Sequence, residues 1–158
     1  MGTPPTVLLF VYGTLRTPVG GPAADTRNYE FVADHVVSST PAVLHDAELL
    51  SFIHYPGTRR GEGSVIGELL ELTDEGLEIT DEIESHPDFF ERQLASVETN
   101  EAICEAWVYW APNQLLEAGQ RIASGDWFDR DRSLDDGRTL DQALVEDKEA
   151  NRAGLNDV

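Results

Sequence analysis

The chain has 158 residues, of which 41% are hydrophobic, as expected for one globular domain with a buried core. Thirty acidic residues outnumber 11 basic ones, so the net charge is -19 and the surface repels nucleic-acid phosphates and anionic membranes. A single cysteine, Cys104, excludes an internal disulfide, and the apolar run at residues 7–11 is too short to span a membrane.

The first half of the chain predicts strands separated by glycine-rich or proline-rich loops. Short runs of β-forming residues predict strands at residues 6–12, 35–40, 42–52 and 65–72. Clusters of glycine and proline predict loops at residues 18–22 and 55–63. The second of these loops also carries Arg59 and Arg60, which can attract an anion or simply face solvent.

The second half predicts a helix, an antiparallel pair of strands and a polar tail. The helix covers residues 74–84, with Thr73 as its N-cap, and two strands follow at 92–98 and 102–110. Short helices are expected at residues 112–122 and around Leu140. This order predicts an α+β domain over residues 1–128 and a polar C-terminal tail over residues 129–158, partly helical.

The helix at residues 74–84 turns one carboxylate toward the interior. On a wheel of roughly 100° per residue, Leu77 and Thr80 lie in a mostly apolar arc, whereas Glu82 lies on the solvent side. Glu84 falls inside the apolar arc, two turns after Leu77. Desolvation and the negative end of the helix dipole both raise the pKa of such a carboxylate toward the range useful for proton transfer. Alternatively, Glu84 bends out to water at the helix end.

A glycine turn directly follows the first predicted strand. Tyr12-Gly13-Thr14-Leu15 places a glycine where the chain can turn sharply and where a ligand can approach the backbone. Successive N–H groups there can bind a carboxylate, and Thr14 adds a hydroxyl. A glycine that merely ends a strand explains the same residues.

Six short motifs follow one another along the chain: Tyr12-Gly13-Thr14-Leu15-Arg16, Gly67-Glu68-Leu69-Leu70, Thr80-Asp81-Glu82-Ile83-Glu84-Ser85, Phe90-Glu91-Arg92, Ala106-Trp107-Val108-Tyr109 and Ser124-Gly125-Asp126-Trp127. Taken together, they resemble the motifs of the gamma-glutamylcyclotransferase-like family, which includes the avirulence-induced-gene-like proteins. The order and spacing of the motifs agree with that family from about Val7 to Trp127.

The resemblance implies a fold, a site and a reaction. The fold is a small mixed β-barrel with flanking helices and a cavity beside the exit of the first strand. Glu84 is the implied catalytic residue, and Tyr12, Gly13, Thr14 and Leu15 are the implied cradle for the glutamyl end of the substrate. The implied reaction is a gamma-glutamyl cyclotransferase reaction that releases 5-oxoproline and an amine from a small gamma-glutamyl amide. It requires no metal or organic cofactor.

Two residues depart from the family pattern. Ser85 replaces the glycine that follows the catalytic glutamate, and Phe90 replaces a tyrosine whose hydroxyl can hold that glutamate. Tyr109 is a candidate substitute for the missing hydroxyl and a candidate substrate-binding residue. These departures leave the substrate open. In a second reading, the same fold is a non-catalytic module that binds a small ligand or a protein, and in a third the chain is a purely structural acidic protein that binds no ligand.

The remaining reactive residues point to no other chemistry. His35, His45, His54 and His86 lack the spacing of metal ligands, and Cys104 is interpreted as a packing residue within a strand. The sequence does not identify the leaving amine or the oligomeric state.

Composition also suggests where the protein works. We expect a cytoplasmic protein, since no signal peptide is evident. Lys148 is the only lysine, and an acidic, lysine-poor chain is typical of halophilic proteins, although acidic proteins also occur in ordinary cytoplasm. A halophilic protein with this charge should become more stable as salt screens its self-repulsion.

Overall fold

The structure is a computed structural model that describes residues 5–17, 26–52, 55–112, 117 and 119–129. Its strands are β1 (Thr6–Val11), β2 (Val36–Phe52), β3 (Tyr55–Thr73), β4 (Glu91–Thr99), β5 (Ile103–Trp110) and β6 (Gln120–Ile122). Its helices are α1 (Asp74–Ile83) and three 3-10 turns, η1 (Tyr29–Phe31), η2 (Ala33–His35) and η3 (Trp127–Asp129).

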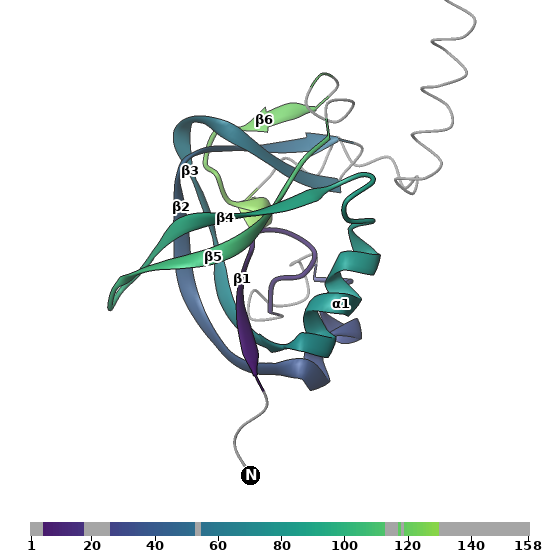
Figure 1. Cartoon of the computed structure of the whole chain (residues 1–158). Helices are drawn as coiled ribbons and strands as arrows, with labels where there is room; N and C mark the ends of the chain where they lie inside the picture. Colours follow the sequence, from purple (N-terminus) through teal and green to yellow (C-terminus); the bar gives the residue numbers. More distant parts are fainter. Residues whose placement is uncertain (1–4, 18–25, 53–54, 113–116, 118, 130–158) are drawn as a thin grey trace, which may run out of the picture.

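Five of the strands close into a barrel. Their order is β3-β1-β5-β4-β2, and β2 pairs again with β3, so the sheet returns to its first strand (Figure 1). The β1–β5 pair is parallel, with Leu9 opposite Trp107, and the other pairs are antiparallel. The predicted fold class, a small mixed β-barrel of the α+β type, is therefore confirmed.

A long hairpin of β2 and β3 corrects two predictions. Residues 35–40 and 42–52 do not form two strands, because β2 continues through Pro41. A proline is tolerated there because β2 pairs with β4 only from Ala42 onward, so only β3 lies beside it at that point.

The predicted loop at residues 55–63 is also wrong, because these residues are the first half of β3. Residues 55–60 pair with residues 47–52 of β2. Gly61 lies against the Glu48 side chain of the paired strand, where a Cβ would lie 2.3 Å from a carboxylate oxygen. Pairing across the hairpin, rather than local composition, therefore decides that these residues form a strand.

The C-terminal predictions are only partly testable. A helix was expected at residues 112–122: Glu117 is helical, but Gln120–Ile122 form β6, which pairs with β2. Residues 113–116 and 118 lie outside the described residues. So do residues 130–158, which include most of the expected tail and the helix around Leu140.

Alternating residues of β1 enter two different cores. Leu9 and Val11 join a cluster that packs against α1 through Ile79 and Ile83. Phe10, from the opposite face of the strand, joins a second cluster. Because β1 is buried on both faces, its sequence is continuously apolar rather than alternating.

Helix α1 begins and ends where its sequence predicts. The Thr73 side chain caps the N-terminus by accepting a 3.2 Å hydrogen bond from the N–H of Gly76. Leu77 and Thr80 are buried, and Glu82 is exposed. Glu84 is the C-cap residue, so its position is set by the last turn of the helix.

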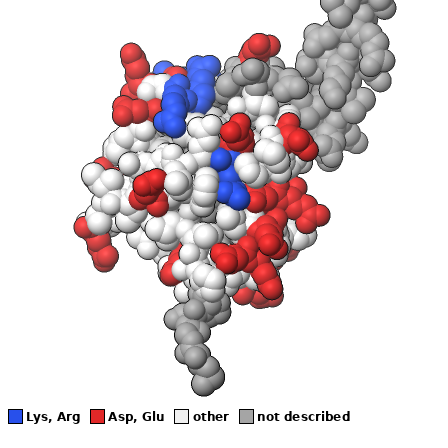
Figure 2. All heavy atoms as spheres, in the orientation of Figure 1, with Lys and Arg blue, Asp and Glu red and all other residues white. Residues whose placement is uncertain are grey.

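The surface carries the expected excess of acid. Figure 2 shows acidic side chains spread over one face, with few basic ones between them. Within the described part of the chain, no helix is long and apolar enough to cross a membrane.

Candidate active site

A small pocket opens where β1 leaves the barrel. Its volume, counted together with the adjoining space that is open to solvent, is about 280 Å³. Its lining residues come from the end of β1, the glycine turn, the start of β3, the end of α1 and β5: Phe10, Val11, Tyr12, Gly13, Thr14, Leu15, Pro56, Glu84 and Tyr109. The structure thus brings all six residues singled out from the sequence, Tyr12 to Leu15, Glu84 and Tyr109, to one pocket.

The turn after β1 is tightly held. The N–H of Arg16 donates to the carbonyl oxygen of Gly13 at 2.9 Å, which closes the turn. Asn28 holds Thr14 from the other side, because its N–H donates to the Thr14 carbonyl at 3.0 Å and its Nδ2 donates to the Thr14 hydroxyl at 2.8 Å. The backbone of the turn is therefore fixed before any ligand binds.

Three consecutive N–H groups of this turn, in residues that line the pocket, have no acceptor among the described residues. Among the described residues, no oxygen accepts a hydrogen bond from the backbone N–H of Gly13, Thr14 or Leu15. Gly13 lets the backbone come close to its surroundings because it has no side chain. Such a run of N–H groups is suited to binding a carboxylate or an oxyanion.

Glu84 is turned inward, as the helical wheel predicts. Its side chain is buried, with a residue exposure of 8%, so the alternative in which it bends out to water is excluded. Burial raises the pKa of Glu84 to about 7, although a hydrogen bond from Tyr55 partly opposes that rise. A carboxyl group with this pKa can both accept and return a proton near neutral pH.

Tyr12 and Tyr109 form a hydrogen-bonded wall of the pocket. The Tyr12 hydroxyl donates to the carbonyl oxygen of Tyr109 at 2.7 Å. The Tyr109 hydroxyl donates to Oδ1 of Asp81 at 2.6 Å and lies 2.8 Å from the hydroxyl of Thr80. Burial raises the pKa of both tyrosines, so both stay neutral at ordinary pH.

The hydroxyl that contacts Glu84 comes from Tyr55 and not from Tyr109. Tyr55 Oη donates to Oε2 of Glu84 at 3.2 Å. The interpretation of Tyr109 as the substitute is therefore wrong, since its hydroxyl is engaged by Asp81 and Thr80. Sequence reasoning missed Tyr55 because it placed this residue in a loop. A hairpin that pairs residues 49–52 with residues 55–58 would have placed Tyr55 in a strand.

The two departures from the family pattern have structural consequences. Ser85 follows the C-cap of α1 with a φ of 55°, in the left-handed region that favours glycine. The helix still ends normally, because the N–H of His86 donates to the Asp81 carbonyl at 2.8 Å. Phe90 is almost fully buried, and its ring packs against that of Tyr55 with centroids 5.9 Å apart.

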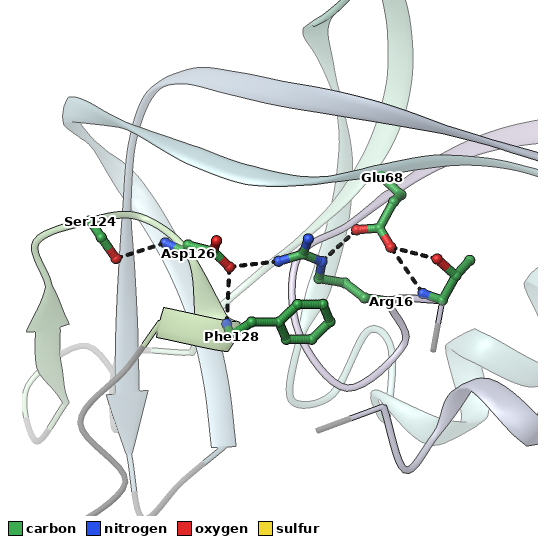
Figure 3. Close-up of polar contacts among 6 residues, drawn as sticks. Arg16, Glu68, Ser124, Asp126 and Phe128 are labelled. Atoms are coloured by element: carbon green, nitrogen blue, oxygen red, sulfur yellow. Dashed lines mark hydrogen bonds and ion pairs between the residues drawn. The ribbon is translucent and has the colours of Figure 1, made fainter. Parts of the chain in front are cut away.

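A buried ion network supports the far end of the glycine turn (Figure 3). The Arg16 guanidinium binds the Glu68 carboxylate through Nε, binds Oδ1 of Asp126 at 2.8 Å through Nη1, and stacks 3.8 Å above the Phe128 ring. Glu68 also accepts hydrogen bonds from the N–H and hydroxyl of Thr17. This network joins the turn to the Gly125-Asp126-Trp127 segment, which the sequence places 110 residues away from Arg16.

The other candidate residues lie away from the pocket lining. Arg59 pairs with Glu48 at 3.3 Å, and the Arg60 guanidinium stacks 4.4 Å from the Trp110 ring. Cys104 packs, half-buried, against the second core. Among the described residues, no group of three His, Cys, Asp or Glu side chains is arranged to hold a metal ion.

Comparison with known proteins places this fold and pocket in one family. A family model described as "Gamma-glutamyl cyclotransferase, AIG2-like" matches residues 9–129. The matched region includes every residue of the pocket. The chain therefore belongs to the gamma-glutamylcyclotransferase family, as the motifs indicate.

Individual relatives agree with this assignment. The gamma-glutamylcyclotransferase family protein YtfP of Escherichia coli K12 is 32% identical over 124 residues, which cover 78% of this chain and 98% of that protein. The solution structure of ytfP from Escherichia coli matches with a TM-score of 0.55 at 27% identity, over 78% of this chain and 98% of that one. The crystal structure of YkqA from Bacillus subtilis matches with a TM-score of 0.59 at 25% identity. It covers 78% of this chain, which spans only 40% of that longer protein.

Proposed function

We propose that this protein cleaves small gamma-glutamyl amides by ring closure and releases 5-oxoproline and an amine. The observation that carries the proposal is that the buried carboxylate of Glu84 and the glycine turn line the same pocket. One small molecule in that pocket can contact a proton-transfer group and a row of backbone donors together.

The bond changes are intramolecular. The α-amine nitrogen of the substrate attacks its own γ-carbonyl carbon, a new C–N bond closes the five-membered ring, and the amide C–N bond breaks. The neutral α-amine loses one proton as its nitrogen becomes the ring N–H, and the leaving nitrogen gains one proton. Because nucleophile and electrophile belong to one molecule, the protein mainly has to fold the substrate and move these protons.

Glu84 is the group suited to moving the protons. In its ionised form it accepts a proton from the attacking amine, and in its protonated form it returns one to the leaving nitrogen. A pKa of about 7 keeps both forms accessible near neutral pH. The same carboxylate thus serves as base and then as acid.

The glycine turn is suited to holding negative charge. The N–H groups of Gly13, Thr14 and Leu15 can bind the α-carboxylate of the substrate or the oxygen that becomes negative when the amine attacks. Tyr12 and Tyr109 supply the neutral wall beside them. The reaction as proposed requires neither a metal nor an organic cofactor.

The test compares two substitutions on the same helix. Glu84→Gln keeps the shape of the side chain but cannot exchange the proton, whereas Glu82→Gln changes an exposed residue two positions earlier. With gamma-glutamyl amino acids, the gamma-glutamyl lysine isopeptide, gamma-glutamyl amines and glutathione as substrates, we expect 5-oxoproline from wild type and Glu82→Gln. Glu84→Gln should lose at least about a hundredfold in rate, the usual contribution of an acid/base group.

The same assay separates the enzyme from a binding module on this fold. Turnover that survives Glu84→Gln would refute the role of that residue. Binding of a gamma-glutamyl compound by the wild-type protein without 5-oxoproline would favour the non-catalytic module.

A further inference from the structure

Tyr55 lies at the tip of the β2–β3 hairpin, where it reaches the helix that carries Glu84. It is the first residue of β3 and pairs with Phe52 across the hairpin. Its side chain is 8% exposed, and its ring packs against Phe90. The Arg27 guanidinium lies 5.8 Å from the centroid of the same ring. Packing therefore fixes the ring and directs its hydroxyl at the carboxylate of Glu84.

The hydrogen bond distinguishes the two oxygens of that carboxylate. Tyr55 Oη donates to Oε2 of Glu84 at 3.2 Å. Within the described residues, Oε1 of Glu84 has no hydrogen-bond partner, and Glu84 lines the pocket. A hydrogen bond to one oxygen of a carboxylate favours one side-chain rotamer. The other oxygen then remains open to a substrate.

We propose that Tyr55 is a positioning residue, whose hydroxyl holds Oε2 of Glu84 so that Oε1 exchanges protons with the substrate. This inference rests on the proposed function. It assigns a role to a residue that the motifs do not include and explains how the chain holds Glu84 although Phe90 has no hydroxyl.

The charge state of Tyr55 fits this role. Burial and the nearby Glu84 carboxylate raise the pKa of Tyr55 well above its ordinary value of 10.0. The hydroxyl therefore keeps its proton and remains a donor through the range in which Glu84 titrates. A donor to the ionised carboxylate also opposes the effect of burial, so that Glu84 is a usable base near neutral pH rather than a permanently protonated acid.

Other charged and titratable groups lie in this region, and the nearest cation to Tyr55 is Arg27, 5.8 Å from its ring centroid, among the described residues. Tyr12 and Tyr109 stay neutral because burial raises the pKa of each. Asp81 is bound to Arg92 and to Tyr109 on the far side of the pocket wall. The centroid of the His86 ring lies 6.3 Å from that of the Tyr109 ring.

The variant Tyr55→Phe removes the hydroxyl and keeps the ring that packs on Phe90. We expect kcat for 5-oxoproline release to fall about tenfold, the loss typical of one hydrogen bond to a charged group. Because that bond favours the ionised carboxylate, the rising limb of kcat/KM against pH should also move to higher pH. Tyr29→Phe is the matched control: Tyr29 packs against the same core, and we expect its loss to change neither quantity.

A titration that needs no turnover tests the same pair directly. The carboxyl carbon of Glu84, followed by NMR, should titrate at higher pH in Tyr55→Phe than in wild type. In the wild-type protein, the ring carbon that bears the Tyr55 hydroxyl should shift as Glu84 ionises, whereas that of Tyr29 should not. An unchanged Glu84 titration in Tyr55→Phe, or a Tyr55 resonance indifferent to Glu84, overturns the proposal.

The two experiments separate two kinds of failure. If wild type releases no 5-oxoproline from any substrate tested, the proposed function fails, while the titration still decides whether Tyr55 holds Glu84. If wild type is active and Tyr55→Phe matches it in kcat and in pH profile, the positioning role fails and the proposed function stands.

Discussion

Gly13 and Pro56 approach so closely that no side chain fits between them. A Cβ on Gly13 would lie 2.2 Å from Cγ and 2.7 Å from Cβ of Pro56. Both residues line the pocket, so this contact sets the distance between the glycine turn and the start of β3. The glycine is thus required by the packing of two segments, as well as by the turn itself.

The variant Gly13→Ala should therefore damage both stability and substrate binding. The added methyl must push the Pro56 ring or the turn aside, and overpacking of this kind costs about 1–3 kcal/mol. We expect that loss in urea unfolding, together with a raised KM. Gly63→Ala is the control, because its Cβ would meet its nearest neighbours at 3.2 Å. Equal losses in both variants would contradict the explanation.

Ser85 has a left-handed backbone conformation that is strained for serine, and a glycine at this position should relieve the strain. The φ of 55° is unfavourable for a residue with a Cβ and free for glycine. We expect Ser85→Gly to raise the free energy of unfolding by about 1 kcal/mol. Ser96→Gly, at an exposed position in the extended strand β4, should lower it instead. A Ser85→Gly variant less stable than wild type would show that the side chain makes a contribution that outweighs the strain.

The raised pKa of Glu84 makes stability depend on pH in a defined direction. Since the folded state binds the proton more tightly than the unfolded state, with pKa values of about 7 and 4.5, the stability that Glu84 contributes is fully present below pH 4.5 and is lost as pH rises through 7. A shift of this size corresponds to about 3 kcal/mol.

The effect of Glu84 is isolated by comparison with Glu84→Gln, because the many other carboxylates titrate in both proteins. The free energy of unfolding of wild type relative to the variant should decrease by about 3 kcal/mol from pH 4.5 to pH 8. A difference that stays constant across this range would mean that Glu84 ionises as a solvated carboxylate does.

The two acids that bind Arg16 should differ in importance because they differ in burial. The side chain of Glu68 is 6% exposed, and that of Asp126 is 29% exposed. Glu68→Gln leaves the buried guanidinium poorly compensated and should cost about 3 kcal/mol. Asp126→Asn should cost about 1 kcal/mol. Chemical denaturation of both variants checks the order, and a reversed order would place the main support of Arg16 at Asp126.

Several features of the site were readable from the sequence because they depend on local periodicity. The spacing of apolar residues along α1, together with its N-cap residue, places Glu84 on the buried face of the helix. This holds whatever the helix packs against. A short apolar run followed by Gly13 marks the end of β1 in the same way. The motifs in their order along the chain identified the family.

The β2–β3 hairpin was not readable in this way. Residues 55–63 have the composition of a loop, and only their pairing with β2 makes them a strand. The role of Tyr55 could not be predicted for this reason, because its contact with Glu84 joins residues 29 positions apart. Local composition carries no information about which distant strand will satisfy a backbone hydrogen bond.

What the sequence alone determined, then, is the family, the inward direction of Glu84 and the place of the glycine turn, because each depends on neighbouring residues and a helical or strand period. Only the tertiary structure decided which hydroxyl holds that carboxylate and which acids hold Arg16. Those contacts depend on barrel closure, which brings β3 and the segment before η3 beside β1 and α1.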